Sequence, residues 1–414
     1  MKNNSFRLDK FKNKEGISAV LVVFFIIVFL GFAALAIDIF HIVVARNELQ
    51  NAADAGALAG ARFLYNGDGT SVNPDANRIA YEATIANKSE KVPVEVNWTG
   101  GNERDVQRGH WSFGTRTFTP NDSLTPPDLW NKTTEELDQD PNFINAIRVK
   151  TRRENTPVAS FFAKIFGLES FNLSAESIAY IGFAGTLAPR EVDQPIAICK
   201  EALKTPDGKY ICSIGRMINS GQNLASRETG GWTDFNQDNP CLGGTNATSV
   251  RSLVCREGNP GPIILGQNIA TNGGEIQTAF NALLNCWESK SNGKTEPWEL
   301  TLAVIECPGN NITTCQKVVG AVTVKIVWIT GAGEDPLYNN APRKMGDWSS
   351  DNPDGKERWN SFVQYFQLKN LDGSPAPYEK KSIYFVPDCE HHGPRGKTGG
   401  ENFGILAKIP VLVK

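Results

Sequence analysis

The chain has 414 residues, enough for two domains of the usual size of about 100–200 residues. Its formal net charge is −3, with acidic and basic residues interspersed, which excludes the electrostatic footprint of a nucleic-acid-binding protein. It contains four histidines and no G-x-S-x-G motif, so a Ser-His-Asp hydrolase has little support. We expect a protein that is not an enzyme and holds no cofactor.

The first predicted element is a membrane-spanning helix. Residues 16–37 carry no charge, and a helix of that length spans about 33 Å, enough to cross a hydrocarbon core. Arg46 is the only basic residue soon after this span, whereas several precede it: Lys2, Arg7, Lys10, Lys12 and Lys14. The positive-inside rule therefore predicts a cytoplasmic leader at residues 1–15 and places everything after Asp38 outside the cytoplasm.

Two peptidases are candidates to remove this segment. Ala34-Leu35-Ala36 has the small-x-small form that signal peptidase accepts, but the apolar run exceeds the roughly 7–15 residues of a secretory signal. A prepilin peptidase would cut after Gly16, yet its pilin-type substrates carry Glu at the position of Leu21. We expect the leader and anchor to be retained, with cleavage after Gly16 as the alternative.

A helix rich in small residues follows, in the stretch LQNAADAGALAGAR at residues 49–62. Nothing between Asp38 and Leu64 breaks a helix, so we expect the membrane helix to continue outward as one rod. Alternating steps of three and four residues predict that one stripe of this helix packs against a neighbour: Ile42, Ala45, Leu49, Ala52, Gly56, Ala59 and Phe63. Gly60 lies beside this stripe and forms a G-x-x-x-G motif with Gly56.

The two glycines need a compensating contact, because each costs about 1 kcal/mol of helix propensity relative to alanine. Close approach of another backbone is the usual source of that compensation. We favour a neighbour within this chain, its own sheet, and keep the same helix of a second copy in a homo-oligomer as the alternative.

Residues 16–62 resemble the N-terminal segment of TadE/TadG-like proteins of the Flp (tight-adherence) pilus assembly system. The matching features are the short basic leader, the span ending in GFAALAID at residues 31–38, and ARNELQNAADAGALAGA at residues 45–61. The resemblance implies a single-pass protein of the bacterial inner membrane with a cytoplasmic N-terminus and a periplasmic or extracellular body. It also implies two kinds of partner, the membrane and other pilus-assembly proteins such as TadE/TadF-like pseudopilins.

The chain departs from this family's pattern at two places. Leu21 replaces the Glu of processed pseudopilins, which favours a TadG-like over a TadE-like role. Many TadG-like proteins carry a von Willebrand A domain with a D-x-S-x-S metal motif, and this chain has none; DWSSD at residues 347–351 ends in the wrong residue.

The rest of the chain predicts an α+β fold in two parts. Residues 38–184 form an external α+β unit, with helices at 76–87 and 157–167 and strands at 91–98, 145–153 and 171–182. A linker at residues 185–195 opens a β-rich, cysteine-containing domain that covers residues 185–414. Its predicted elements are one amphipathic helix at 274–287 and strands at 321–330, 361–368, 382–387 and 405–413.

All eight cysteines lie in this second domain, beyond the membrane: Cys199, Cys212, Cys241, Cys255, Cys286, Cys307, Cys315 and Cys389. An even number in an exported region predicts four disulfides, although their pairing does not follow from sequence. The simplest hypothesis joins sequence neighbours, Cys199 with Cys212 and Cys307 with Cys315.

Two segments resemble metal sites. Asp234, Asn236 and Asp238 repeat the D-x-N-x-D start of a calcium loop, but Asn239 replaces its Gly and Thr245 its closing Glu, which favours a surface turn. In DCEHH at residues 388–392, adjacent side chains rarely converge and a disulfide-bonded Cys389 cannot be a ligand. GKT at residues 396–398 resembles the end of a P-loop whose first Gly is missing. We therefore predict no metal or nucleotide site.

Together these features predict a membrane-anchored, non-enzymatic component of Flp/Tad-type pilus assembly that acts through protein–protein contacts outside the cytoplasmic membrane. Two alternatives stay open. One is a minor pilin-like structural subunit of the fibre, and the other is an exported calcium- or carbohydrate-binding adhesin.

Overall fold

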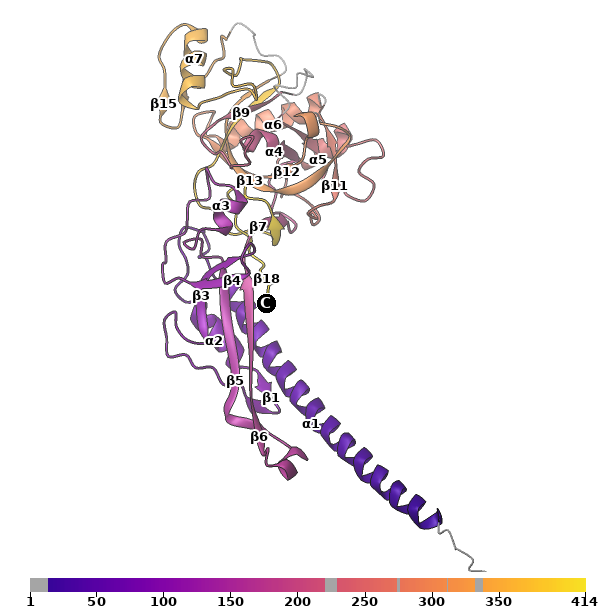
Figure 1. Ribbon diagram of the computed structural model, residues 1–414. Helices are drawn as coiled ribbons and strands as arrows, with labels where there is room; N and C mark the ends of the chain where they lie inside the picture. The colour runs from indigo at the N-terminus through magenta and orange to yellow at the C-terminus, as the bar shows by residue number, and fades with distance from the viewer. Residues whose placement is uncertain (1–13, 220–228, 274–275, 311, 332–337) are drawn as a thin grey trace, which may run out of the picture.

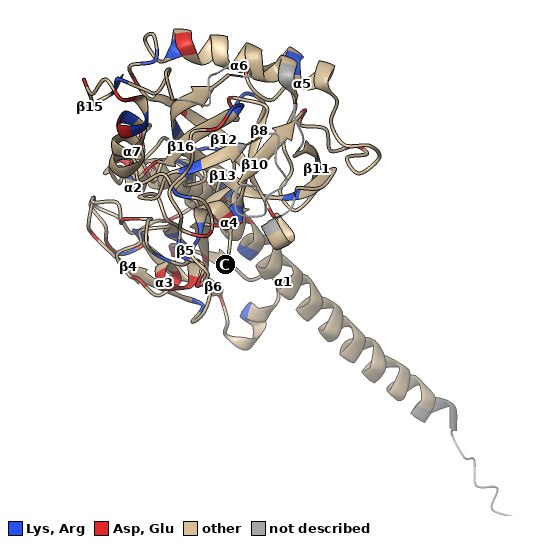
Figure 2. Cartoon of the chain, turned by 90° about the horizontal axis from the view of Figure 1, so that it is seen from above, with Lys and Arg blue, Asp and Glu red and all other residues tan. Residues whose placement is uncertain are grey.

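The computed structural model describes residues 14–219, 229–273, 276–310, 312–331 and 338–414, so the predicted leader falls almost entirely outside the described residues. Helix α1 (Lys14–Arg62) is one continuous rod of 49 residues, about 74 Å long at 1.5 Å per residue. Figure 1 shows its N-terminal half standing free and its C-terminal half packed on the body. The free length carries no charged residue from Ser18 to Ile37 and is tan in Figure 2. It fits a single-pass membrane anchor.

The first unit packs α1 and α2 (Ala76–Ile85) on an antiparallel sheet of five strands. The strand order is β18 (Val411–Leu412), β6 (Ser170–Tyr180), β5 (Ala146–Ala159), β3 (Val106–Ser112) and β4 (Thr117–Pro120). Alternate residues of β5, among them Ile147 and Val149, are buried with the alanines of the two helices in one core. Shorter elements complete the unit: β1 (Lys88–Ser89), β2 (Val92–Pro93) and α3 (Thr134–Asp138).

Two elements predicted here are wrong. The strand expected at residues 91–98 is reduced to β2, because the segment turns away after Pro93 and pairs further only at Glu95 with Arg152. The helix expected at residues 157–167 is the end of β5 followed by the single 3₁₀ turn η1 (Ala163–Phe166). Pro157 lies within a bulge of the β5–β6 ladder, where its missing N–H costs no hydrogen bond, and pairing resumes at Val158.

The second unit is built on seven strands: β8 (Ile196–Cys199), β9 (Arg216–Asn219), β10 (Gly230–Thr233), β11 (Asn268–Asn272), β12 (Trp298–Ile305), β13 (Cys315–Thr330) and β16 (Ser382–Pro387). They are ordered β11-β10-β8-β12-β13-β16-β9. Strand β11 also pairs with the start of β13, which closes β11, β10, β8, β12 and β13 into a ring. Among the described residues of this unit, four α-helices accompany them: α4 (Lys200–Leu203), α5 (Ala247–Leu253), α6 (Gln277–Lys290) and α7 (Gly355–Tyr365). The α+β fold with a β-rich, disulfide-containing second part is confirmed.

The strand predicted at residues 361–368 is instead the end of α7. Asp354 caps this helix by accepting the N–H groups of Lys356 and Glu357, and the buried residues Trp359, Phe362 and Val363 follow helical spacing. The apolar residues of this segment fit both the alternation of a strand and the three- and four-residue spacing of a helix. Periodicity alone therefore does not distinguish a strand from a helix here. The strand predicted at residues 405–413 is also wrong, except for β18.

The C-terminal end of the chain returns to the first unit. Strand β17 (Lys397–Gly400) pairs with β7 (Phe183–Thr186), and β18 then becomes the edge strand of the first sheet beside β6. The N–H of Ile178 donates to the carbonyl oxygen of Lys414 at 2.7 Å. Two chain crossings therefore join the units, one near residue 186 and one near residue 397.

The four disulfides are Cys199–Cys307, Cys212–Cys389, Cys241–Cys315 and Cys255–Cys286, and no cysteine is free. The predicted pairing of sequence neighbours is therefore wrong. Strand pairing explains two of the bonds. Parallel β8 and β12 set Cys199 opposite Ile305, two residues from Cys307, and antiparallel β9 and β16 bring the flanking Cys212 and Cys389 to the same end of the sheet.

Candidate functional site

The small-residue half of α1 packs directly against α2. A Cβ added at Gly56 would lie 1.8 Å from Oγ1 of Thr84 and 2.9 Å from the carbonyl oxygen of Ala80. One added at Gly60 would lie 2.7 Å from Cβ of Ala80 and 3.2 Å from a methyl group of Ile147. The close backbone approach of the two glycines is thus made within the chain, chiefly to α2 rather than to the sheet.

The predicted stripe is only partly buried. Ala45, Leu49, Ala52, Gly56 and Gly60 are buried, Ile42 and Ala59 are half-buried, and Phe63 is 49% exposed. Phe63 is wrongly placed for two reasons: α1 ends at Arg62, and a stripe spaced at 3.5 residues drifts around a helix of 3.6 by roughly 20° per seven residues. The core positions near the end of α1 are instead Ala53, Ala57 and Ala61.

A second contact lies at the membrane-proximal end of the sheet, where the β5–β6 hairpin meets α1. The side chain of Asp38 is 2% exposed although its neighbours Ile37 and Ile39 are about half exposed. Its carboxylate accepts the backbone N–H groups of Phe161 (2.7 Å), Phe162 (2.9 Å) and Ala163 (2.5 Å). Asp38 therefore satisfies the donors that open the turn η1, and it ties the hairpin tip to the end of the uncharged span of α1.

Polar contacts continue this junction one turn further along α1. His41 pairs with Glu90 and packs its ring 4.7 Å from that of Phe161. Arg153, which is 4% exposed, donates from Nη1 to the carbonyl oxygen of Ser89 at 2.6 Å. We call Asp38, His41, Glu90 and Arg153 the membrane-proximal cluster. It joins α1, the β1–β2 hairpin and the β5–β6 hairpin.

Two hydroxyl groups add hydrogen bonds to the backbone of α1. Ser89 donates to the carbonyl oxygen of Ala45 at 3.1 Å, and Thr151 donates to that of Leu49 at 2.9 Å. Both helix carbonyls are buried, so these bonds hold α1 at a defined rotation and height on the sheet.

The bulge of β5 is held by Glu95. Burial opposes the charge of this carboxylate, but the backbone N–H groups of Glu154, Asn155 and Thr156 and the hydroxyl of Thr156 donate to it and lower its pKa to about 2. These hydrogen bonds fix the conformation of the bulge, whose polar residues Glu154, Asn155 and Thr156 precede the hairpin tip in β5.

The residues that resemble the start of a calcium loop, Asp234, Asn236 and Asp238, form a turn. The N–H of Asn236 donates to the carboxylate of Asp234 at 3.3 Å, and the N–H of Asp238 donates to the side-chain oxygen of Asn236 at 3.0 Å. Each oxygen thus serves the turn itself. Within the described ranges, the metal-type side chains that converge lie elsewhere.

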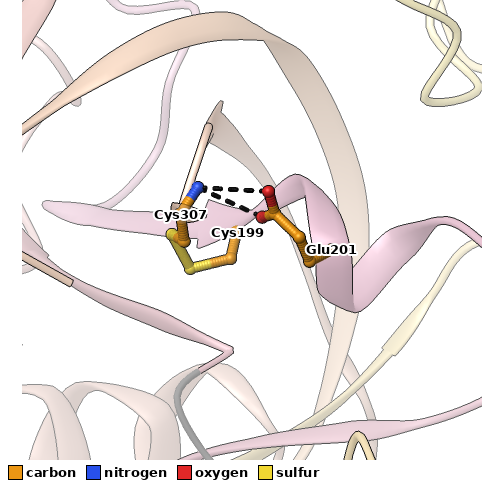
Figure 3. A group of neighbouring side chains, drawn as sticks. All are labelled: Cys199, Glu201 and Cys307. Atoms are coloured by element: carbon orange, nitrogen blue, oxygen red, sulfur yellow. Dashed lines mark hydrogen bonds between the residues drawn. A yellow bond between two sulfur atoms is a disulfide. The ribbon is translucent and has the colours of Figure 1, made fainter. Parts of the chain in front are cut away.

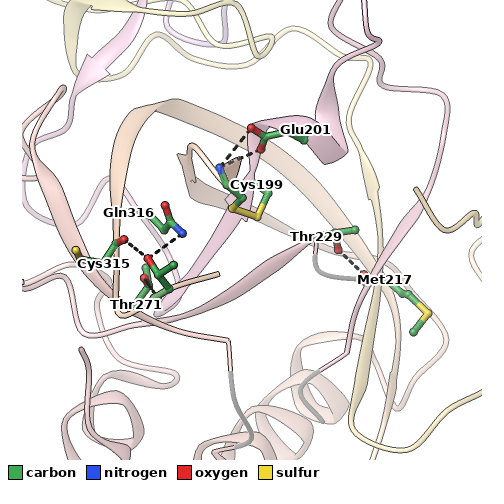
Figure 4. Close-up of a disulfide and its surroundings, with 9 residues drawn as sticks. Cys199, Glu201, Met217, Thr229, Thr271, Cys315 and Gln316 are labelled. Carbon is green, nitrogen blue, oxygen red and sulfur yellow. Dashed lines mark hydrogen bonds between the residues drawn. A yellow bond between two sulfur atoms is a disulfide. The ribbon is translucent and has the colours of Figure 1, made fainter. Parts of the chain in front are cut away.

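One converging group is Cys199, Glu201 and Cys307, drawn in Figure 3. The two sulfurs are joined in a disulfide, so neither is a thiolate that could bind a metal. Burial raises the pKa of Glu201, whose carboxylate accepts the N–H of Cys307 at 3.1 Å. Figure 4 sets this disulfide among residues of the strand ring, including Thr271 and Cys315. The group therefore fastens the ends of β8 and β12.

The other group, Glu299, Asp388 and His392, contains two of the residues that the sequence placed in DCEHH. Asp388 lies 3.1 Å from His392 and 3.1 Å from the ammonium group of Lys325. Burial opposes the charge of Asp388, yet the neighbouring imidazole of His392 and ammonium group of Lys325 lower its pKa. Lys325 supplies the positive charge that this carboxylate needs. The side chains of the GKT segment belong to β17 and its approach, and no helix follows them there.

Comparison with known families addresses the helix and the first sheet. Residues 16–62 match the model of a family described as putative Flp pilus-assembly TadE/G-like, and residues 59–179 match one described as putative Tad-like Flp pilus-assembly. The TadE/G-like match thus covers α1, and the second match continues the likeness to Tad-type pilus-assembly proteins to residue 179. The resemblance predicted from the first 62 residues is confirmed and now extends through β6. A comparison with curated proteins found no match, and neither did one with solved structures.

The matched residues, 16–179, contain both contacts described above, the glycine face of α1 on α2 and the membrane-proximal cluster. These families connect the chain with pilus assembly. The sequence marked Asp38 only as the end of the apolar span, and it did not identify the contact between Asp38 and the hairpin tip. Two signals were present: a lone carboxylate that ends an apolar run on an unbroken helix, and the apolar segment FFAKIFGL between polar stretches.

Proposed function

We propose that this chain is a membrane-anchored, non-enzymatic component of Flp/Tad-type pilus assembly that works through protein contacts outside the cytoplasmic membrane. The observation that carries the proposal is the agreement between the matched residues, 16–179, and the unit in which α1 and the sheet are joined. Because α1 packs directly on the sheet of that unit, the membrane helix and the body are held in a fixed relative position.

The proposed location is the bacterial inner membrane, with the N-terminus in the cytoplasm. The basic leader before the span supports this orientation. The four disulfides support it independently, because they form in an oxidising compartment and all belong to the part beyond α1.

A scaffolding role is supported by the state of the polar groups in the second unit. In the two clusters that converge there among the described residues, Cys199 and Cys307 form a disulfide, and Asp388 lies in ion-pair distance of Lys325 and His392. In a protein that acts through surface contacts, we expect disulfides and ion pairs of this kind to stabilise the fold and not to take part in catalysis.

Fractionation of cells that assemble these pili tests the proposal. We expect deletion of the gene to abolish surface fibres, the chain to sediment with the inner membrane, and its N-terminal leader to be intact by mass spectrometry. Leu21→Glu is the matched control, because it restores the residue that prepilin peptidase substrates carry. A wild-type chain that starts at Ile17 and appears in sheared fibres would instead identify a pilin-like subunit. Normal fibres in the deletion strain would contradict a role in assembly.

A further inference from the structure

The tip of the β5–β6 hairpin, residues 161–168, exposes an unusual amount of apolar surface. Five large apolar side chains in these eight residues are exposed: Phe161 (53%), Phe162 (38%), Ile165 (76%), Phe166 (83%) and Leu168 (54%). Lys164 is the only charged residue among them. Such a contiguous patch on a folded protein marks a surface that meets something other than water.

The tip lies beside the membrane span of α1. In Figure 1 the hairpin runs down from the sheet toward the free half of the helix. A hollow of about 500 Å³ between them is lined by Leu30, Ala34 and Ile37 of α1 and by Phe162, Ile165 and Phe166 of the tip. The tip therefore reaches back about 10 Å along the span from Asp38.

The position of the bilayer along α1 can be bounded from the helix surface. Large apolar side chains are exposed from Val20 to Val44, a length of about 36 Å, and Asp38 does not interrupt them because it points into the body. A hydrocarbon core is about 30 Å thick. Wherever such a core is placed on this length, it contains residues 30–37 and hence the level of the tip.

The backbone of the tip is suited to a medium without water. Asp38 accepts three of its N–H groups, those of Phe161, Phe162 and Ala163. The N–H groups of Ile165, Gly167 and Leu168 donate to carbonyl oxygens within the turn at 3.0–3.2 Å. Irregular backbone at membrane depth is stable only when its polar groups are paired in this way.

We propose that the tip of the β5–β6 hairpin enters the leaflet on the side of the body and forms a second membrane contact. The acyl chains of the lipids cover its aromatic and aliphatic side chains and fill the hollow beside α1. Lys164 extends its ammonium group toward the headgroups. The polar bulge at Glu154, Asn155 and Thr156 marks the water side of this contact.

The contact fixes how the body stands on the bilayer. A single helix leaves the body free to rotate about the helix axis and to tilt, whereas a second inserted point removes both freedoms. This inference rests on the membrane anchoring proposed above and not on the role in pilus assembly.

Tryptophan fluorescence of the full chain in vesicles tests the inference. Phe166→Trp adds a reporter at the tip, and its emission is read as the difference from the wild-type chain. We expect the added emission to be blue-shifted, insensitive to acrylamide in the water, and largely quenched by lipids brominated on their acyl chains. Ile165→Trp provides a second reporter with the same expected result.

Leu242→Trp is the matched control, because Leu242 is 85% exposed in the second unit, far from α1 in the sequence. We expect its emission to be red-shifted, quenched by acrylamide and untouched by the brominated lipids. The inference is overturned if the tip reporters behave like this control. It is also overturned if their blue shift disappears when the protein is diluted in lipid, since the tip then contacts another protein. A chain that fails to float with the vesicles would contradict the anchoring itself.

Discussion

Replacing Gly56 and Gly60 together by alanine separates close packing from helix propensity. Propensity alone predicts that the variant is more stable by about 2 kcal/mol, because each glycine costs about 1 kcal/mol relative to alanine. The structure predicts the opposite sign. The new Cβ atoms would lie 1.8 Å from Oγ1 of Thr84 and 2.7 Å from Cβ of Ala80, so α1 and α2 must move apart.

Neither contact can be relieved cheaply. Thr84 is fully buried and its hydroxyl donates to the carbonyl oxygen of Ala80 at 2.7 Å, so turning it away breaks a buried hydrogen bond. Overpacking costs about 1–3 kcal/mol at each site, and the broken bond adds about 1 kcal/mol. The balance is a net loss of about 1–5 kcal/mol for the double variant.

Hydrogen exchange of the full chain in detergent measures this loss where it occurs. We expect faster exchange in α2 and in the facing residues of β5, with unchanged protection in the second unit. Gly31→Ala is the matched control, because a Cβ at Gly31 meets nothing within 4 Å and should leave exchange unaltered. Equal or greater protection in the double variant would refute the reasoning, since the glycines would then serve no contact.

Three further changes have defined outcomes. Glu95→Gln should destabilise the first unit by about 1 kcal/mol at neutral pH, after discounting a half-exposed group for solvent screening. Because the folded pKa of about 2 lies below the ordinary 4.5, that stabilisation is complete above pH 4.5 and is lost as the pH falls toward 2, so urea midpoints of variant and wild type should converge there. Asp38→Asn should accelerate exchange of the amides of Phe161, Phe162 and Ala163, because one amide oxygen cannot replace a carboxylate that accepts three N–H groups; unchanged exchange would show that the turn holds itself. The Cys212–Cys389 disulfide joins residues 177 apart, whereas Cys255–Cys286 joins residues 31 apart. Replacing Cys212 and Cys389 by serine should therefore cost more stability in denaturant titration than replacing Cys255 and Cys286, by at most about 1.5 kcal/mol because the other disulfides shorten the larger loop; equal losses would contradict the loop-entropy account.

The features that sequence predicted correctly are those that depend on local pattern. An uncharged run of membrane length and an unbroken run of helix formers describe α1 without reference to the rest of the chain. The alternation in residues 145–153 and 171–182 likewise reflects one buried face of β5 and β6. The glycine pair predicted a close neighbour for the same reason, because its cost must be offset by a contact.

The features that sequence missed depend on partners distant along the chain. Residues 157–159 carry a helix-start pattern, yet they extend β5 because β6 offers them ladder bonds. The disulfides join residues 31 to 177 apart, as the strand order dictates, and no spacing rule contains that order. The return of β18 to the first sheet is equally invisible in a two-residue strand.

Asp38 shows how one residue changes meaning when the fold is known. As sequence it marks the end of the membrane span, because a carboxylate facing lipid is too costly to keep. In the structure it faces the body, where three backbone N–H groups stabilise its charge. The same carboxylate that would limit insertion therefore allows the hairpin tip to lie at the level of the span. The sheet that carries the hairpin also holds the returning strand β18, so the membrane contacts proposed above would orient the second unit as well.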